Sequence, residues 1–378
     1  MIPSSKHPIT ILTEGYLGTS HAKTATGIIR YGDWTISSII DSSKQGKTLL
    51  EVTGISHSAP VVANLTQALN LSPRPQSLIL GIAPVGGGLP EAWRNIIKEA
   101  ISNGLNIISG LHLFLNEDTE LKQLSEQHGV ILWDVRDPEL YPASAARSVA
   151  AQKPRPQGTK VITLVGSDCN IGKMCTALEL DREAKKQGLN SAFVATGQTG
   201  IMISGNGVPL DRVIIDFAAG AMENAIWEAI ERNALTSMSS SSDEHNTAVG
   251  KFQRGLIFVE GQGSLIHPGY SGVTLSLLHG SNPDGMILCH KPDRIKVYNQ
   301  YDITIPSLAK LIEIYENAVT WITNDGKASA KVVGIALNTS AYSDDEALKL
   351  VKQAQSETGL PATDPIRYGV AELMKYIK

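Results

Sequence analysis

The sequence is poor in cysteine, in aromatic residues and in net charge. Its 378 residues include 3 cysteines, 5% aromatic residues and a formal net charge of −4. Three irregularly spaced cysteines exclude a disulfide framework and a zinc cluster. A charge so close to balance gives no general attraction to nucleic acid or to an anionic membrane surface. We therefore expect a reduced, cytoplasmic protein that acts on a small molecule, with no nucleic-acid or membrane partner.

Long apolar runs are also missing. No run approaches the roughly 20 residues that a membrane-spanning helix needs. The N-terminal stretch MIPSSKHPITILTEG lacks the apolar core of a signal peptide. With 42% hydrophobic residues, the chain can nevertheless bury a large core. The composition is that of an ordinary globular protein.

Short β-rich segments alternate with helical patterns along both halves of the chain. In the first half the strand-like segments are ITILTEG, TISSIID, SLILGIA, NIISGLH and GVILWDV, and an amphipathic helix, LPEAWRNIIKEAISNG, separates two of them. In the second half they are VITLVG, SAFVATG, RVIIDFAAG, GLIFVEGQG, GMILCH and VVGIALNTS. This alternation predicts two α/β domains with parallel, doubly wound sheets.

Two polar segments interrupt the alternation. The first, AAQKPRPQGTK, contains two prolines and a glycine. It predicts a boundary between a domain of residues 1–152 and a domain of residues 153–378. The second, TSMSSSSDEHNTA at 236–248, is serine-rich and too polar to order itself by burying apolar surface. We expect a flexible surface insertion there.

The stretch VITLVGSDCNIGKMCTALEL carries the clearest functional pattern. A strand, a glycine-rich turn, a Gly-Lys pair and a helix follow one another, which is the context that a phosphate-binding loop requires. Backbone N–H groups and the helix N-terminus would face one anion, and the lysine, expected to be solvent-accessible, would add a positive charge. The residues expected to bind the phosphates of a cofactor are Gly166, Ser167, Asp168, Cys169, Asn170, Ile171, Gly172, Lys173, Met174 and Cys175.

Met174 stands where a serine or threonine usually holds magnesium in such loops. A thioether is a soft ligand, whereas magnesium prefers hard oxygen donors. A metal could still be held by Thr176, by Asp168 or by an acid after a neighbouring strand, either Asp216 or Glu260. The sequence alone leaves these alternatives open.

Further loops end strands at the same expected edge of the second sheet. They are ATGQTGIMISG, EGQGSLIHPGYSG and CHKPDR. Glu260 and His267 are the expected catalytic residues, and His279, His290 and Lys291 are further candidates for proton transfer. No base is evident beside Cys169, for which we expect a passive role. The residues expected to bind substrate are Thr196, Gly197, Gln198, Thr199, Gly200, Asp216 and Gln262.

The first half offers weaker signals. The stretch EGYLG at 14–18 after the first strand and Asp41 after the second are typical of a dinucleotide site, but the three-glycine fingerprint is absent. A domain that closes over substrate or forms a dimer is the preferred interpretation. The three glycines at 86–88, within APVGGGLPEAW, form a second candidate anion site.

The motifs together resemble a two-domain family long catalogued as a domain of unknown function. The resemblance rests on GSDCNIGK, VATGQTGIMISG, DFAAG, VEGQGSLIHPGYSGVTLSLLHGSNPD and LCHKPDR, and on EGYLGTSHAKTATGIIRYG, IIDSSKQGKT, GIAPVGGGLPEAWR and SGLHLFL in the first half. It implies a Rossmann-like N-terminal domain and a P-loop C-terminal domain, with methionine typical at position 174. Some members are taken to be D-glutamate N-acetyltransferases, which implies acetyl-CoA as donor. The second domain also resembles, more weakly, dethiobiotin synthetase.

Three functions remain open on these grounds. N-acetylation of D-glutamate, or of a similar amino acid, needs no metal at the loop, because the pyrophosphate and 3′-phosphate of coenzyme A can be held by N–H groups and a lysine. A ligase similar to dethiobiotin synthetase would use ATP and magnesium, with Glu260 or Asp216 on the metal. A nucleotide-regulated binding protein would do no chemistry. We favour the acetyltransferase and expect it to form homo-oligomers.

Overall fold

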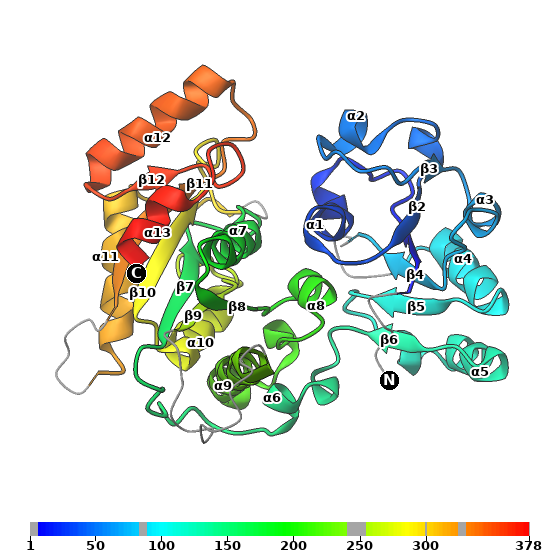
Figure 1. Ribbon diagram of the computed structural model, residues 1–378, viewed down its shortest axis with the longest axis horizontal. Coiled ribbons are helices and arrows are strands. Elements are labelled where there is room, and N and C mark those ends of the chain that lie inside the picture. The colour runs from blue at the N-terminus through cyan, green and yellow to red at the C-terminus, as the bar shows by residue number, and fades with distance from the viewer. Residues whose placement is uncertain (1–6, 83–88, 240–254, 299–300, 324–329, 378) are drawn as a thin grey trace. The chain divides into compact units, whose positions relative to one another are not determined.

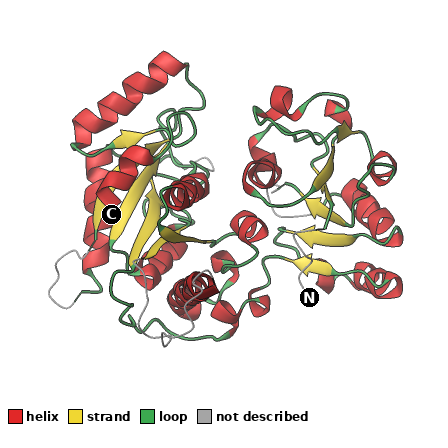
Figure 2. Ribbon diagram, in the orientation of Figure 1, coloured by secondary structure: helices red, strands yellow, loops and turns green. Residues whose placement is uncertain are grey.

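The computed structural model describes residues 7–82, 89–239, 255–298, 301–323 and 330–377. Contacts divide the chain into two compact units. The first comprises residues 1–137 and 198–209, and the second comprises residues 138–197 and 210–378. Each unit contains one parallel sheet with helices on both faces, as the ribbon coloured by secondary structure shows (Figure 2). Among the described helices, none is long and apolar enough to cross a bilayer.

The first unit has a six-stranded sheet of order β3-β2-β1-β4-β5-β6, with every pair parallel. Reversal of the strand order between β1 and β4 is the arrangement of a Rossmann fold. The strands are β1 (Ile9–Leu12), β2 (Ile36–Ile40), β3 (Val61–Val62), β4 (Ser77–Leu80), β5 (Asn106–Ser109) and β6 (Leu132–Asp134). The helices are α1 (Lys23–Tyr31), α2 (Leu49–Thr53), α3 (Leu65–Leu69), α4 (Glu91–Ser102), α5 (Thr119–His128) and, from the later segment, α8 (Gln198–Ser204).

The second unit has a six-stranded parallel sheet of order β12-β11-β10-β7-β9-β8. Its strands are β7 (Lys160–Gly166), β8 (Asn190–Val194), β9 (Gly255–Val259), β10 (Gly285–His290), β11 (Lys331–Leu337) and β12 (Ala362–Thr363). Helices α7 (Lys173–Lys186) and α13 (Ala371–Ile377) pack together on one face of this sheet (Figure 1). The remaining helices are α6 (Pro142–Ala145), α9 (Ile215–Ser239), α10 (Ser271–Ser281), α11 (Leu308–Thr320) and α12 (Asp344–Thr358).

The prediction of two parallel α/β domains is confirmed. Every strand-like segment of the first half forms a strand, and so do all but one in the second half. The exception is RVIIDFAAG, for which the strand prediction is wrong, because helix α9 begins at Ile215. Helix α9 packs against β8, β9 and α10, so its first turns are rich in apolar and small residues. Over so short a window, this pattern cannot be told from a buried strand.

The limits of the two predicted polar segments differ in detail from those in the structure. The second unit begins at Pro138 and so includes residues that precede the predicted boundary. Glu223 of α9 fixes the chain at the predicted boundary itself, since its carboxylate accepts the N–H groups of Ala151 at 2.8 Å and Lys153 at 2.7 Å. Helix α9 extends to Ser239 and takes in the first residues of the predicted insertion. Residues 240–248 of that insertion, and the three glycines at 86–88, lie outside the described residues.

Candidate phosphate-binding site

The phosphate loop lies at the carboxyl end of β7, a central strand flanked by β9 and β10. Ligands of open α/β sheets bind at this edge. The loop ends at Gly172, whose φ of 111° is a conformation that residues with a side chain rarely adopt. Helix α7 begins directly after it and has no side-chain cap. The uncapped N-terminus of a 14-residue helix, next to a glycine-rich turn, is a general anion-binding arrangement.

Two glycines make room for the lysine of this loop. A Cβ atom on Gly166 would lie 2.7 Å from Cδ1 of Ile171 and 3.1 Å from Cδ of Lys173. A Cβ atom on Gly261, which follows β9, would lie 2.7 Å from the same Cδ and only 1.8 Å from the carbonyl oxygen of Leu164 in β7. The lysine stem therefore runs between two backbone segments that only glycine allows to approach so closely.

The expectation that Lys173 is solvent-accessible is wrong. Its side chain is 6% exposed, and its Nζ donates a hydrogen bond to the main-chain oxygen of Asp168 at 2.6 Å. Burial lowers the pKa of this ammonium, while Cys289, Cys169, Asp168 and Glu260 act in the opposite direction. The lysine is thus folded back onto the loop, and a phosphate would draw its ammonium away from that carbonyl oxygen.

Asp168 places a carboxylate inside this anion-binding loop. The side chain is fully buried. Its Oδ1 accepts the N–H group of Cys169 at 2.7 Å, and its Oδ2 accepts the N–H group of Tyr298 at 2.9 Å and an Nη1–H of Arg294 at 2.8 Å. The Arg294 guanidinium also lies 5.3 Å from the centre of the Tyr298 ring, within cation–π range. The negative charge of the carboxylate is therefore balanced by a fixed positive charge.

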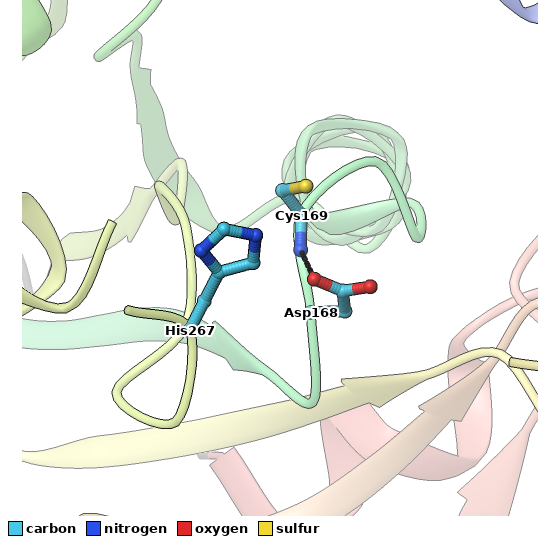
Figure 3. A group of neighbouring side chains, drawn as sticks. All are labelled: Asp168, Cys169 and His267. Carbon is cyan, nitrogen blue, oxygen red and sulfur yellow. Dashed lines mark hydrogen bonds between the residues drawn. The ribbon is translucent and has the colours of Figure 1, made fainter. Parts of the chain in front are cut away.

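Two of the alternatives for a metal ligand, Thr176 and Asp168, already have partners of their own. The hydroxyl of Thr176 donates to the main-chain oxygen of Gly172 at 3.0 Å. Within the described part of the chain, one group of at least three potential ligands has its atoms within 4.8 Å of one another, and it consists of Asp168, Cys169 and His267 (Figure 3). The guanidinium on Asp168 opposes a cation at this group, because like charges repel.

His267 lies in the loop after β9, with both ring nitrogens hydrogen-bonded. Nδ1 accepts the N–H group of Gly269 at 3.1 Å, so in the neutral ring Nε2 carries the proton and donates it to the main-chain oxygen of Tyr298 at 3.2 Å. The ring packs against Tyr270, at 4.4 Å between ring centres, and Tyr301, at 5.2 Å. The imidazole thus joins the loop after β9 to the backbone at Tyr298, and it can act as a base only by giving up one of these bonds. Its catalytic role stays a prediction.

The structure also brings His267 beside Cys169, which the sequence did not indicate. Figure 3 shows the two side chains as neighbours, one from the loop after β9 and one from the phosphate loop, and their potential ligand atoms lie within 4.8 Å of one another. A thiol next to an imidazole is a common nucleophile pair. Here, however, the imidazole presents a protonated nitrogen on one side and a hydrogen-bonded one on the other. A passive role for Cys169 remains the better interpretation.

Glu260 lies at the end of β9 and gathers several of the predicted substrate-binding residues. Its Oε2 accepts the N–H groups of Thr196 at 2.9 Å and Gly197 at 3.3 Å, and its main-chain oxygen accepts the Thr196 hydroxyl at 2.9 Å. The Nε2 of Gln262 lies 2.6 Å from the place of a Cβ on Gly197, so a larger residue would not fit there. These four residues form one hydrogen-bonded and packed group at the carboxyl edge of the sheet.

The other predicted substrate-binding residues are not part of this group. Gln198, Thr199 and Gly200 are in helix α8, which belongs to the first unit. There the Thr199 hydroxyl bonds that of Thr24 at 2.9 Å. Asp216 is exposed in the first turn of α9, and not at the end of a strand as predicted. None of these four belongs to the group around Glu260.

Asp41 in the first unit has a structural role in place of the ribose-binding role that the pattern suggested. The side chain is fully buried. It accepts the N–H group of Leu17 at 3.0 Å, and the N–H and hydroxyl groups of Ser43 at 3.1 and 2.7 Å. These bonds fix the turns after β1 and β2 from within, so the carboxylate is not presented to a ribose hydroxyl.

Several residues that shape the site had no clear signal in the sequence. Tyr315 of α11 is fully buried, and its hydroxyl donates to the Gly166 oxygen at 2.7 Å and accepts the N–H group of Leu265 at 3.2 Å. It thereby joins the start of the phosphate loop to the loop after β9, and burial raises its pKa. In the sequence, a tyrosine on the apolar side of an amphipathic helix is indistinguishable from a core residue. Arg294 did lie in a noted motif, CHKPDR, but nothing there pointed to Asp168.

His290, at the end of β10, is a further support of the loop. Its Nδ1 lies 2.9 Å from the hydroxyl of Ser167, and burial lowers the pKa of the imidazole. The neighbouring Cys289 is buried, its Sγ lies 3.7 Å from the Thr176 hydroxyl, and burial raises its pKa to about 11. Both side chains are therefore neutral near pH 7 and serve as supports for the loop.

Comparisons with known proteins agree with this architecture. Residues 148–374 match the P-loop domain, and residues 42–138 the Rossmann-like domain, of the domain of unknown function DUF1611. A protein named D-glutamate N-acetyltransferase from Tritonibacter scottomollicae is 37% identical over 300 residues, which are 79% of this chain and 80% of that protein. One of the same name from a Pseudoalteromonas species is 38% identical over 299 residues, with the same coverage.

A solved structure extends the similarity to almost the whole chain. The crystal structure of a DUF1611 family protein from Anabaena variabilis has a TM-score of 0.83 at 35% identity, and the match covers 98% of this chain and 99% of that one. A parallel Rossmann-like sheet, a P-loop on a second parallel sheet and these matches together show that the chain belongs to the DUF1611 family.

Proposed function

We propose that the protein is an N-acetyltransferase that moves the acetyl group of acetyl-CoA to the amino group of D-glutamate or a similar amino acid. One observation carries this proposal. The loop has the N–H groups, ammonium and guanidinium of an anion site, while Met174 stands at the usual magnesium position and the hydroxyl of the nearby Thr176 bonds the main-chain oxygen of Gly172. The names of relatives that are 37% and 38% identical support it.

The donors around the loop fit a phosphate ligand that arrives without a metal. The N-terminus of α7 contributes backbone N–H groups and a partial positive charge. Lys173 and Arg294 add two full positive charges, both attached to the loop through Asp168. Coenzyme A would supply an activated acetyl thioester, and these groups would hold its phosphates.

The transfer itself needs a nitrogen nucleophile and a proton acceptor. The substrate ammonium must first lose a proton to a base. The amino nitrogen then forms a bond to the acetyl carbon as the carbon–sulfur bond breaks, and coenzyme A leaves as a thiolate that takes up the second proton from the nitrogen. Of the two predicted bases, Glu260 suits this role better, because a carboxylate has about four acceptor sites on two oxygens, and the N–H groups of Thr196 and Gly197 both bond the same oxygen, Oε2. The two nitrogens of His267 are both committed to backbone groups.

Either base can act only if it lies near the acetyl group, which is far from the phosphates of acetyl-CoA. Between the pyrophosphate and the sulfur of coenzyme A lies a pantetheine arm as long as about four extended residues, or ~14 Å. With the pyrophosphate in the loop, Glu260 reaches the acetyl group only if this arm folds back over the loop. Variants of Glu260 should therefore be judged by kcat as well as by affinity, since a base alters the chemical step.

The deciding experiment combines calorimetry with turnover. We expect acetyl-CoA to bind without magnesium, acetylation of D-glutamate to survive EDTA, and Met174→Thr to leave the rate unchanged, because the loop needs no metal ligand. A rate that vanishes with EDTA and returns with magnesium would overturn the proposal. Saturable binding of acetyl-CoA without turnover of any amino acid would indicate a binding protein instead.

One observation favours a second candidate function, that of an ATP-dependent ligase. Glu260 is a buried carboxylate at the end of β9, the strand next to β7, and its negative charge acts to raise the pKa of Lys173 against the larger effect of burial. An acid in this position can hold magnesium in an ATP-dependent ligase of the dethiobiotin synthetase type. Release of ADP that depends on magnesium and on a carboxylate substrate would favour the ligase, and Met174→Thr would then raise the rate by restoring an oxygen ligand.

A further inference from the structure

Asp168 is an acid at a place where acids are unfavourable. It lies between Gly166 and the N-terminus of α7, where a bound phosphate and a carboxylate would repel each other. The side chain is not a mobile surface group. It is fully buried and held by the N–H groups of Cys169 and Tyr298 and by Arg294, at 2.7–2.9 Å. The charge is therefore a fixed part of the site.

Asp168 also occupies groups that a phosphate would otherwise use. The N–H group of Cys169, within the loop, points to its Oδ1, and the Arg294 guanidinium lies on its Oδ2. The Lys173 ammonium bonds its main-chain oxygen. Two full positive charges and one loop N–H group thus already face this single residue, so the carboxylate acts as an internal anion.

We propose that Asp168 determines which phosphate ligand the loop accepts, admitting the diphosphate of a coenzyme A-type ligand and excluding the triphosphate of ATP. This inference rests on the proposed function. Repulsion from a fixed carboxylate grows with the charge of the ligand. A triphosphate concentrates more negative charge at the loop than a diphosphate diester, and magnesium, which usually offsets it, meets Met174 and an inward-turned Thr176.

Arg294 determines the strength of this discrimination. With the guanidinium in place, the pair of Asp168 and Arg294 is neutral overall, so a ligand of modest charge can bind next to it. Removal of the carboxylate leaves a net positive charge that attracts the more charged ligand more strongly. Removal of the guanidinium leaves a net negative charge and has the opposite effect. The two substitutions must therefore shift the preference in opposite directions.

The test compares affinities for coenzyme A and ATP by calorimetry at matched salt, with and without magnesium. We expect Asp168→Asn to raise the affinity for ATP relative to coenzyme A at least tenfold. The matched control is Asp284→Asn, at the other end of β7, where the carboxylate likewise accepts a backbone N–H, that of Val161 at 2.7 Å, and pairs with Arg155 at 3.2 Å. That variant should keep the wild-type ratio within about twofold.

Arg294→Gln gives a second, independent measurement, which also serves if the asparagine variant does not fold. We expect both affinities to fall, and that for ATP to fall more. If either folded variant has the same ratio of ATP affinity to coenzyme A affinity as the wild type, the role proposed for Asp168 is wrong. The proposed acetyltransferase function would still hold, provided that the wild type binds coenzyme A and acetylates D-glutamate. A wild type that binds ATP more tightly than coenzyme A and acetylates nothing would overturn the proposed function itself.

Discussion

Gly261 offers the sharpest test of the packing beneath the phosphate loop. A Cβ atom at this position would lie 1.8 Å from the Leu164 carbonyl oxygen, whereas real Cβ contacts are essentially never below 3.0 Å. Gly261→Ala therefore requires β7 or the loop after β9 to move by about 1.2 Å, the difference between these distances. Overpacking of this kind usually costs 1–3 kcal/mol, and against a backbone oxygen we expect ~3 kcal/mol or more.

Thermal unfolding measures this effect directly. For a unit the size of the second one, ~3 kcal/mol corresponds to a decrease in Tm of roughly 6–12 °C. Gly272→Ala is the matched control, since it lies in α10 and a Cβ there meets nothing within 4 Å. It should be neutral or stabilise by up to ~1 kcal/mol. If Gly261→Ala shifts Tm by no more than about 2 °C, the close approach described for this glycine is incorrect.

Three further predictions concern the loop and its supports. Lys173→Met keeps the apolar stem but removes the ammonium, so affinity for coenzyme A should fall at least tenfold by calorimetry, and an unchanged affinity would remove the loop from the site. Cys289, with a pKa of about 11, should resist alkylation near neutral pH. The partly buried Cys169 should react, and coenzyme A should protect it. If mass spectrometry shows that coenzyme A does not slow the alkylation of Cys169, the prediction that the loop binds coenzyme A is contradicted. Burial lowers the pKa of His290 below 6.5, so below that pH the unfolded chain binds a proton that the folded protein does not, and the free energy of unfolding falls. The free energy of unfolding of His290→Gln, measured by urea unfolding, should therefore decrease less between about pH 7 and pH 5.5 than that of the wild type. If it decreases by the same amount, the lowered pKa is not that of His290.

The sequence predicted those features that depend on local pattern. The alternation of strands and helices, the phosphate loop after β7 and the position of Glu260 at the end of β9 all follow from residues close together in the chain. What it could not predict depends on contacts between distant segments. The burial of Lys173 requires Gly261 to lie beside it, and the charge balance at Asp168 requires Arg294, 126 residues away. Neither Gly261 nor Arg294 lies at a sequence distance from the loop that would indicate the contact.

Contacts between distant segments also explain why the strand predicted at RVIIDFAAG is wrong and why α8 belongs to the first unit. A run of apolar and small residues is buried in either conformation, and only the neighbours of α9 decide that it is a helix. Helix α8 follows β8 directly, as a loop of the second sheet would, yet its residues pack in the first unit. The Trp34 indole donates to the main-chain oxygen of Met202 at 2.8 Å, a bond between residues 168 positions apart.

Helix α8 makes the order of synthesis matter. The first unit lacks the later segment that contains α8 until residue 209 has been translated, 72 residues after the end of its main segment at 137. At about 5–20 residues per second, this takes roughly 4–14 s. During that time the Trp34 indole and the surface of Gly110, where Gln198 later packs, lack their native partners. The N-terminal unit is therefore not a domain that can finish folding on the ribosome before the next begins, and a chain cut at 152 would keep this defect permanently.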